Sequence, residues 1–207
     1  AYSEKREFDA EGKEISMTST RIRRELRDGA PSFRTIERNG KPVDEAPAPR
    51  PAASRRKNGG EQDWIQEFPE ALDYKIAGEE TIHGRPALIL DFEPRAGYKP
   101  SNMKARIFEK MRGRIWIDKA ESELVKTDAE MFDTVQIGFG VLAKITKGTR
   151  FSLGRRKVDG GPWLMEWTKF RFDARFLFKT IRQEQLMRWE EYKLRPDRAG
   201  SAVAASR

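Results

Sequence analysis

The stretch that decides the fold is residues 84–118, which read GRPALILDFEPRAGYKPSNMKARIFEKMRGRIWID. Residues 86–93 include the apolar run Ala87-Leu88-Ile89-Leu90, which is typical of a strand covered on both faces. Residues 101–111 carry apolar side chains every fourth position, as a helix with one apolar face does. Residues 114–118 return to a strand pattern. We therefore predict a sheet with a short helix packed on it.

Strand patterns continue on both sides of this stretch. Upstream, a short helix is predicted over residues 62–72 and a strand over residues 73–82. The chain also opens with a three-strand meander over residues 2–8, 14–26 and 32–38, closed by the turn signal Asn39-Gly40. Downstream, strands are predicted over residues 121–132, 134–145, 149–158, 163–173 and 175–194. We predict an α+β fold in which a strongly bent antiparallel sheet of about eleven strands, an incomplete β-barrel, wraps two short helices.

The composition narrows the class of protein. The chain has 207 residues, of which 37% are apolar and 36% are charged. A half-open sheet with one face in water requires such a polar composition. The chain has no cysteine, which excludes disulfides, thiolate nucleophiles and Cys-bearing metal sites.

Two segments lack the large apolar residues that stabilise a fold by burial. Residues 44–61 are rich in Pro, Ala, Arg and Gly, and residues 196–207 are small and polar. Such segments cannot offset their ordering entropy. We predict one domain over residues 1–195, with a mobile loop at 44–61, followed by a disordered tail at 196–207.

No constellation in the sequence indicates catalysis. His83 is the only histidine, so a histidine-based metal cluster is impossible and a general base would lack a partnered nucleophile. Asp118, Glu121 and Glu123 cluster at one turn, where Asp118 is expected to shape the hairpin and the glutamates to face solvent. We predict no enzyme activity, no cofactor and no metal site.

A group of apolar residues indicates a binding site more clearly than any polar residues indicate a catalytic one. The two predicted helices present apolar faces to a sheet rich in Phe and Trp. If the sheet stays open, an apolar cleft is left between helix and sheet; an ordinary packed core is the alternative. The residues predicted to line this cleft as a ligand-binding site are Trp64, Phe68, Met103, Ile107, Phe108 and Met111.

The net charge of +8 is concentrated in one region. Residues 140–195 hold 14 Lys and Arg against 6 Asp and Glu, which accounts for the whole excess. Strict alternation is expected to place Phe170, Phe172, Phe176 and Phe178 inward and Lys169, Arg171, Arg175 and Lys179 outward. A bulge near Thr168-Lys169 is implied, because the apolar positions change parity there. We interpret this region either as an ordinary solvated face or as a surface that faces anionic lipid head groups or an acidic partner. Basic residues interleaved with aromatic ones could also stack nucleic acid bases, but alternation of core and surface positions gives the same pattern, and we predict no nucleic acid binding.

The segment from Gly84 to Pro94, the helix at 101–111 and the strand Gly113-Arg114-Ile115-Trp116-Ile117-Asp118 together resemble the periplasmic lipoprotein-carrier superfamily, the LolA/LolB-like fold, which includes the sensor domain of RseB. The opening residues 2–6 also resemble uncharacterised secreted proteins of environmental bacteria. The match covers residues 73–133. The resemblance implies a half-barrel covered by helices and a cavity for lipoprotein acyl chains. The long N-terminal helix of the family is absent from this chain, and its acyl-release residues have no counterpart.

Two functions remain open at this stage. One is a non-catalytic cell-envelope binding protein that holds a lipid or a lipoprotein acyl group in the helix–sheet cleft. The other is a structural or sensor-type interaction protein whose open sheet docks a protein partner. We expect a periplasmic or secreted location, with a signal peptide removed before Ala1.

Limited proteolysis tests the predicted loop. Cleavage is expected first near Arg55-Arg56-Lys57, because these basic residues lie in the segment predicted to be mobile. The two fragments should remain associated, which size-exclusion chromatography would show. Resistance to trypsin at these positions would contradict the loop prediction.

Overall fold

The computed structural model describes most of the chain, with gaps. The described residues are 1–9, 11–27, 30–44, 66–137, 143–158, 160–176, 179–190 and 192. Residues 45–61 of the predicted loop, Trp64 of the predicted cleft and the predicted tail lie outside these ranges.

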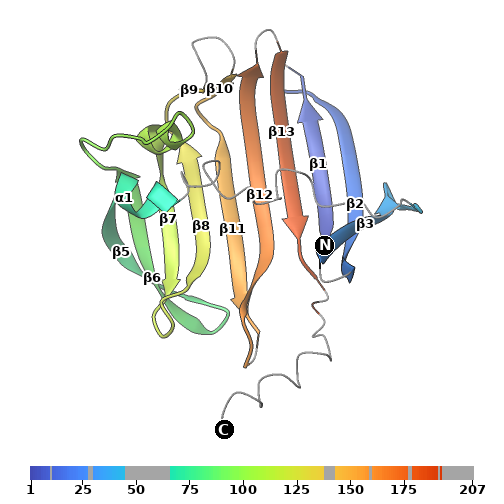
Figure 1. Cartoon of the computed structure of the whole chain (residues 1–207), viewed down its shortest axis with the longest axis horizontal. Coiled ribbons are helices and arrows are strands. Elements are labelled where there is room, and N and C mark those ends of the chain that lie inside the picture. The colour runs from blue at the N-terminus through green and yellow to red at the C-terminus, as the bar shows by residue number, and fades with distance from the viewer. Residues whose placement is uncertain are drawn as a thin grey trace.

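The fold is a single antiparallel sheet (Figure 1). Its strands in chain order are β1 (Tyr2–Phe8), β2 (Glu14–Arg27), β3 (Ala30–Arg38), β4 (Lys41–Pro42), β5 (Leu72–Ile82), β6 (Arg85–Pro94), β7 (Met111–Asp118), β8 (Leu124–Met131), β9 (Val135–Ile137), β10 (Ala143–Ile145), β11 (Arg150–Lys157), β12 (Trp163–Phe176) and β13 (Lys179–Arg188). Eleven of them follow one another in the order β4-β3-β2-β1-β13-β12-β11-β8-β7-β6-β5, while β9 and β10 attach beside β12. The predictions of antiparallel pairing and of about eleven strands are confirmed.

The chain begins in the middle of its own sheet. β1 pairs with β2 on one side and with β13 on the other, and Tyr2 to Phe8 lie opposite Arg188 to Arg182 without a break. This long-range pairing joins the N-terminal meander to the last strand of the sheet. The turn at Asn39-Gly40 forms as predicted, with positive φ at both residues, the conformation of a type I′ hairpin turn.

The helices are shorter than predicted over the residues that the structure describes. There α1 spans Phe68–Ala71, and the second helix, η3 (Ala105–Lys110), is a 3-10 helix. The side chain of Asn102 accepts hydrogen bonds from the backbone N–H groups of Lys104 and Ala105, and β7 begins at Met111, so only about two turns fit between them. Neither helix has the length or the apolar run needed to cross a bilayer, among the residues that the structure describes.

The prediction of a strongly bent sheet that wraps the helices is wrong. β4 and β5 form the two edges and do not pair, and the sheet neither closes nor curls strongly (Figure 1). The reason lies in the helices, since helices of four and six residues cannot fill a barrel. They lie on one face at the β5–β8 end and leave the fold mostly β rather than α+β.

The last hairpin also differs from the prediction. β12 continues through Asp173 to Phe176, and β13 begins at Lys179, so the predicted break between the two strands at residue 174 is wrong. Asp173 is held inside the strand because Arg182 on β13 donates to its carboxylate at 2.9 Å. The predicted bulge is present but sits at Glu166, where Gly154 lies opposite Trp167 and Arg155 opposite Met165.

The main core lies under α1 and η3. The ring of Phe68 meets those of Phe92 and Phe108 edge to face, with centroid distances of 5.5 and 5.8 Å. The Phe92 ring passes over Gly113 on β7, where an added Cβ would lie 2.8 Å from Phe92 Cζ and 2.1 Å from the carbonyl oxygen of Asp128. Glycine is therefore required at this position by the close approach of β8 and Phe92.

Replacement of Gly113 by alanine should destabilise the protein. The new Cβ would displace backbone as well as the Phe92 ring, and overpacking of this kind costs roughly 1–3 kcal/mol. Urea unfolding would measure the free energy of unfolding. Gly161→Ala is the matched control, because its Cβ would meet nothing closer than 3.4 Å; equal effects of the two substitutions would contradict this account of Gly113.

Candidate functional site

The sheet has two faces of opposite character. The face that packs against α1 and η3, here called the helix face, carries Phe92, Ile115, Ala129, Phe151 and Phe170, which share rows or neighbouring rows of the strand register. The opposite face is called the ladder face, because charged residues stand opposite one another across successive strands. Neither α1 nor η3 packs on the ladder face.

Two rows define the ladder face. One reads Lys75, Asp91, Arg114, Asp128, Ser152 and Lys169, and the other reads Arg112, Glu130, Arg150, Arg171, Glu184 and Arg6, each across six consecutive strands of the sheet.

Opposite charges pair along these rows. Arg114 donates to both carboxylate oxygens of Asp91 at 2.6 and 3.1 Å, and both Arg112 and Arg150 reach Glu130, at 2.8 and 3.1 Å. These arginines hold the pKa of Glu130 below its usual value, and Arg114 does the same for the pKa of Asp91. The pairs are exposed, so each contributes little to stability, but together they fix the positions of the side chains.

A hollow of about 520 Å³ lies on the ladder face over β6, β7, β8 and β11. Its lining is the paired charges just described, together with Phe92, Glu93, Gly113, Trp116, Asp128 and Ala129. A second hollow of about 370 Å³ lies on β11–β13 and is lined by Arg156, Glu166, Trp167, Arg188, Trp189 and Glu190. Both hollows are lined by charged and apolar groups alike, and both lie on the ladder face, away from the predicted cleft.

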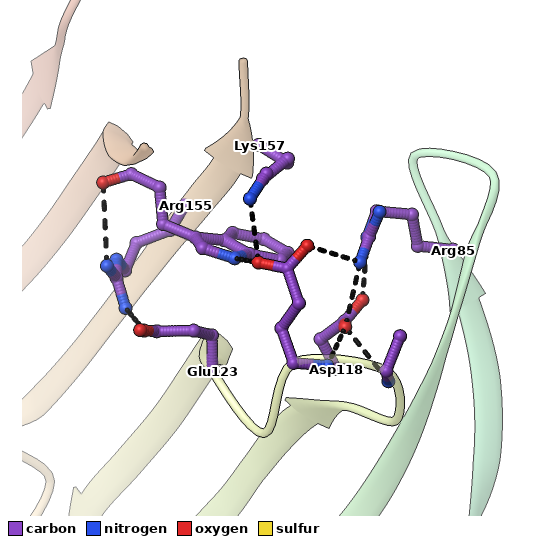
Figure 2. A network of polar contacts seen from close by, with 8 residues as sticks. Arg85, Asp118, Glu123, Arg155 and Lys157 are labelled. Atoms are coloured by element: carbon purple, nitrogen blue, oxygen red, sulfur yellow. Dashed lines mark hydrogen bonds and ion pairs between the residues drawn. The ribbon is translucent and has the colours of Figure 1, made fainter. Parts of the chain in front are cut away.

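A buried carboxylate closes one end of the ladder face (Figure 2). Asp118 ends β7, and its side chain is fully buried. Arg85 donates to both of its oxygens at 2.7 and 2.9 Å, and the backbone N–H groups of Ala120 and Glu121 donate to Oδ1 at 3.1 and 2.8 Å. The prediction that Asp118 shapes the turn is confirmed.

The neighbouring glutamates, which were expected to face solvent, accept hydrogen bonds from other side chains. Glu121 accepts from Lys157 at 2.7 Å and from the indole N–H of Trp163 at 2.9 Å, while Glu123 accepts from Arg155 at 3.0 Å (Figure 2). The network of Arg85, Asp118, Glu121, Lys157 and Trp163, here called the clasp, therefore ties the ends of β6, β7, β11 and β12 together.

The hydrogen bonds from Arg85 and from the turn N–H groups lower the pKa of Asp118 from its ordinary value of 3.8 to about 2, against the opposing effect of burial. The pKa is lower in the folded protein than in the unfolded chain. The clasp therefore adds stability above about pH 4, and that stability is lost as the pH falls through 2. The ionised carboxylate serves as a structural anchor and has no proton available at neutral pH.

The single histidine belongs to the same end of the molecule. His83 sits in the β5–β6 turn with φ of +51°, and its Nε2 lies 3.1 Å from Glu166 Oε2 on β12. β6 and β12 are separated by three strands, or about 19 Å at the usual strand spacing. The end of this hairpin therefore leans across the ladder face, where Ile82, Ala87, Trp116, Val125 and Trp163 form a second, small core.

The structure brings five of the predicted cleft residues to the region of α1 and η3. Phe108 is 3% exposed and Phe68 is partly buried in the core, while Ile107 and Met111 pack against it from η3 and β7. Met103 precedes η3 and is 37% exposed. Two hollows lie elsewhere, on the ladder face, and the rings of Phe68, Phe92 and Phe108 pack against one another between these helices and the sheet.

The predicted alternation on β12 is confirmed at residues 169–172. Lys169 and Arg171 are exposed on the ladder face, and Phe170 and Phe172 stack on the helix face with centroids 5.4 Å apart. Phe151 on β11 joins them edge to face at 6.4 Å and is 37% exposed. The side chains of residues 175, 176, 178 and 179, the other half of the predicted pattern, lie outside the described part.

Comparison with known proteins yields structural matches at low sequence identity. No family model and no curated protein matches the sequence. A domain from Vibrio parahaemolyticus described as an outer membrane lipoprotein-sorting protein matches with 14% identity, a TM-score of 0.30, and coverage of 93% of this chain and 86% of that one.

A DUF1329 family protein from Desulfovibrio piger matches with 17% identity, a TM-score of 0.28 and coverage of 90% and 84%. The Pseudomonas aeruginosa MucA/MucB complex matches with 12% identity, a TM-score of 0.25 and coverage of 89% and 87%. The chain is thus similar to these solved structures at identities of 17% or less and TM-scores of 0.30 or less.

Substitution of Asp118 by asparagine tests the clasp. Removal of the charge leaves Arg85 without its bidentate partner, and hydrogen bonds to charged groups contribute roughly 1.5–3 kcal/mol. The loss in free energy of unfolding should appear at pH 7 and shrink toward pH 2, where Asp118 itself becomes protonated. Asp91→Asn, which removes an exposed bidentate pair, should cost no more than about 1 kcal/mol. A loss for Asp118→Asn that is the same at both pH values would contradict the role of its charge.

Proposed function

We propose that the protein is a non-catalytic binding protein of the cell envelope and that its open sheet docks a protein partner on the ladder face. The observation that supports this most is the filled space between helices and sheet. Phe68, Phe92 and Phe108 interlock there, whereas two hollows lie on the opposite face, which neither of the described helices covers. The envelope location rests on the sequence resemblance of residues 73–133.

The chemistry of the described residues supports a binding role. Asp118 is buried in an ion pair, and the only described contact of His83 is the carboxylate of Glu166. No cluster of three or more His, Asp or Glu suited to a metal ion occurs among the described residues. These groups stabilise the fold, and none of them stands beside a nucleophile that it could activate.

The ladder face has the properties of a protein-docking surface. Charges over its central strands are already paired, as Arg114 is with Asp91 and Arg112 is with Glu130, so the positions of these side chains are fixed before a partner arrives and less side-chain entropy is lost on binding. Arginine and tryptophan, which dominate binding energy at interfaces, line both hollows. The alternating charges favour a partner with the complementary pattern and disfavour others.

A second candidate function is the holding of a lipid or a lipoprotein acyl group. It is favoured by apolar exposure on and beside the helix face, since Met103 and Phe151 are each 37% exposed next to the core. In this candidate, Met103 and Ile107 would move apart from the sheet, and Trp64, Phe68, Phe108 and Met111 would complete the cleft. The basic strands would then face an anionic membrane.

Site-specific photo-crosslinking in the envelope fraction of the host distinguishes the two candidates. A photoreactive phenylalanine analogue at Lys169, exposed on the ladder face, should give one discrete protein adduct. The same analogue at Met103, exposed beside η3, is the control and should give none. Charge reversal by Arg171→Glu should abolish the adduct.

Native mass spectrometry of the protein purified from the same fraction completes the test. The docking function predicts that no lipid is retained at stoichiometric amounts. A co-purifying lipid, together with an adduct from Met103 and none from Lys169, would overturn the docking function in favour of the acyl-holding one.

A further inference from the structure

The second hollow, here called the Trp hollow, carries a site of its own. Its volume of about 370 Å³ lies within the range of small-molecule sites. It is built where β11, β12 and β13 lie side by side, at the end of β13 that is paired with the start of β1 (Figure 1). Its lining is Arg156, Glu166, Trp167, Arg188, Trp189 and Glu190.

One wall of the hollow is fixed by a glycine. Gly154 on β11 lies directly opposite Trp167, and an added Cβ would come within 2.4 Å of Trp167 Nε1 and 2.6 Å of Cε2. The indole therefore lies across the glycine and occupies the space that a side chain would take. An aromatic ring seated on a cross-strand glycine is held against the sheet and offers a rigid platform.

The opposite wall is tied down after β13 ends. The backbone N–H of Trp189 donates to the carbonyl of Glu166 at 2.8 Å, and the hydroxyl of Tyr192 donates to the carbonyl of Met165. The Glu166 side chain is in turn held by His83. The walls of the hollow are thus positioned by contacts within the protein before any ligand binds.

The polar groups of the hollow offer both donors and acceptors. Arg156 and Arg188 are exposed and, within the described residues, form no ion pair, so their N–H groups are available. Glu166 and Glu190 contribute acceptor oxygens, and the four charges cancel. A neutral ligand whose hydroxyls both donate and accept, and whose ring has an apolar face to lie on an indole, matches all of these groups.

The register extends this arrangement beyond the hollow. Trp167, Arg188, Tyr2 and Arg21 stand opposite one another on β12, β13, β1 and β2. Trp167 and Tyr2 are therefore two strands apart, which is about 9–10 Å and roughly the length of a disaccharide. Two aromatic platforms at this spacing, with a guanidinium between them, suit a linear chain of sugars laid across the strands.

We infer that the Trp hollow binds a neutral linear oligosaccharide, with one sugar against Trp167 and Trp189 and the chain running over Arg188 toward Tyr2. This activity is separate from the docking of a protein partner and does not depend on it. A carboxylate-rich peptide or an anionic membrane would be drawn to basic residues anywhere on this face, whereas a neutral sugar requires the hollow itself.

Isothermal titration calorimetry with the tetrasaccharides of β-1,4-linked glucose and of β-1,4-linked N-acetylglucosamine tests the inference. At least one should bind with one-to-one stoichiometry and the same affinity at low salt and at 0.5 M salt, since screening acts on charged ligands. Arg188→Gln should weaken binding about tenfold or more, because it removes hydrogen bonds from a charged donor. Tyr2→Ala should weaken the tetrasaccharide but leave the disaccharide unchanged.

Lys169→Gln is the matched control, because Lys169 is exposed on the same face of β12 and loses the same charge. It should bind as the unaltered protein does. The inference is overturned if neither tetrasaccharide binds, if Lys169→Gln weakens binding as much as Arg188→Gln, or if a polyglutamate peptide or anionic vesicles compete at low salt and not at high salt. Circular dichroism of each variant confirms that it is folded.

Discussion

The strand register across β6, β7, β8, β11, β12 and β13 is the constraint on which the rest of the structure depends. Because each residue faces its partner without slippage over most of these strands, residues of one parity all reach the same face. One face thereby collects Phe92, Ile115 and Phe170, and the other collects the charged rows. A slip of one residue at any pair would place arginine against the aromatic core.

The register also explains why so polar a chain folds as one sheet. The helices cover only the β5–β8 end of the helix face, so most of the sheet must tolerate water. Opposite charges such as Arg114 and Asp91, or Arg112 and Glu130, satisfy one another across neighbouring strands. Like charges directly opposite one another would oppose pairing, as at Arg150 and Arg171, where Glu130 and Glu184 supply the compensation.

The clasp links the fold to both proposed binding surfaces. Asp118 accepts a hydrogen bond from the backbone of Glu121 and so fixes the β7–β8 turn. The Glu121 side chain in turn accepts hydrogen bonds from Lys157 and Trp163 at the β11–β12 hairpin. The same hairpin contributes Arg156 and, just beyond the clasp, Glu166 to the Trp hollow. The buried carboxylate therefore positions the end of the ladder face without touching a ligand.

Local signals in the sequence were sufficient for much of the fold. Alternation located most strands, Asn39-Gly40 located a hairpin, and Asp118 was recognised as a turn residue. The predicted length of the second helix was too great. Met and Ile repeat every four residues there, which is typical of a helix, but Met111 belongs to strand β7. Asp173 is predicted to be a turn residue because an aspartate in a strand needs a partner. That partner, Arg182, can be identified only once β12 and β13 are paired.

The candidate site could be predicted from the sequence less well than the fold. The predicted cleft used residues that are close along the chain, and these meet in and beside the core. The ladder face and the Trp hollow join residues far apart in sequence, such as Tyr2 and Arg188, whose proximity follows only from the pairing of β1 with β13. The one local signal was Gly154, a glycine inside a strand, which marks close approach by another group.

The central claim is that the space between helices and sheet is a filled core, so that binding takes place on the ladder face. Titration of the purified protein with the apolar dye N-phenyl-1-naphthylamine tests it most directly. The interlocked rings of Phe68, Phe92 and Phe108 predict no saturable one-to-one increase in dye fluorescence. A saturable, stoichiometric signal that palmitate displaces would contradict the claim, because it would require an open apolar cleft in this region.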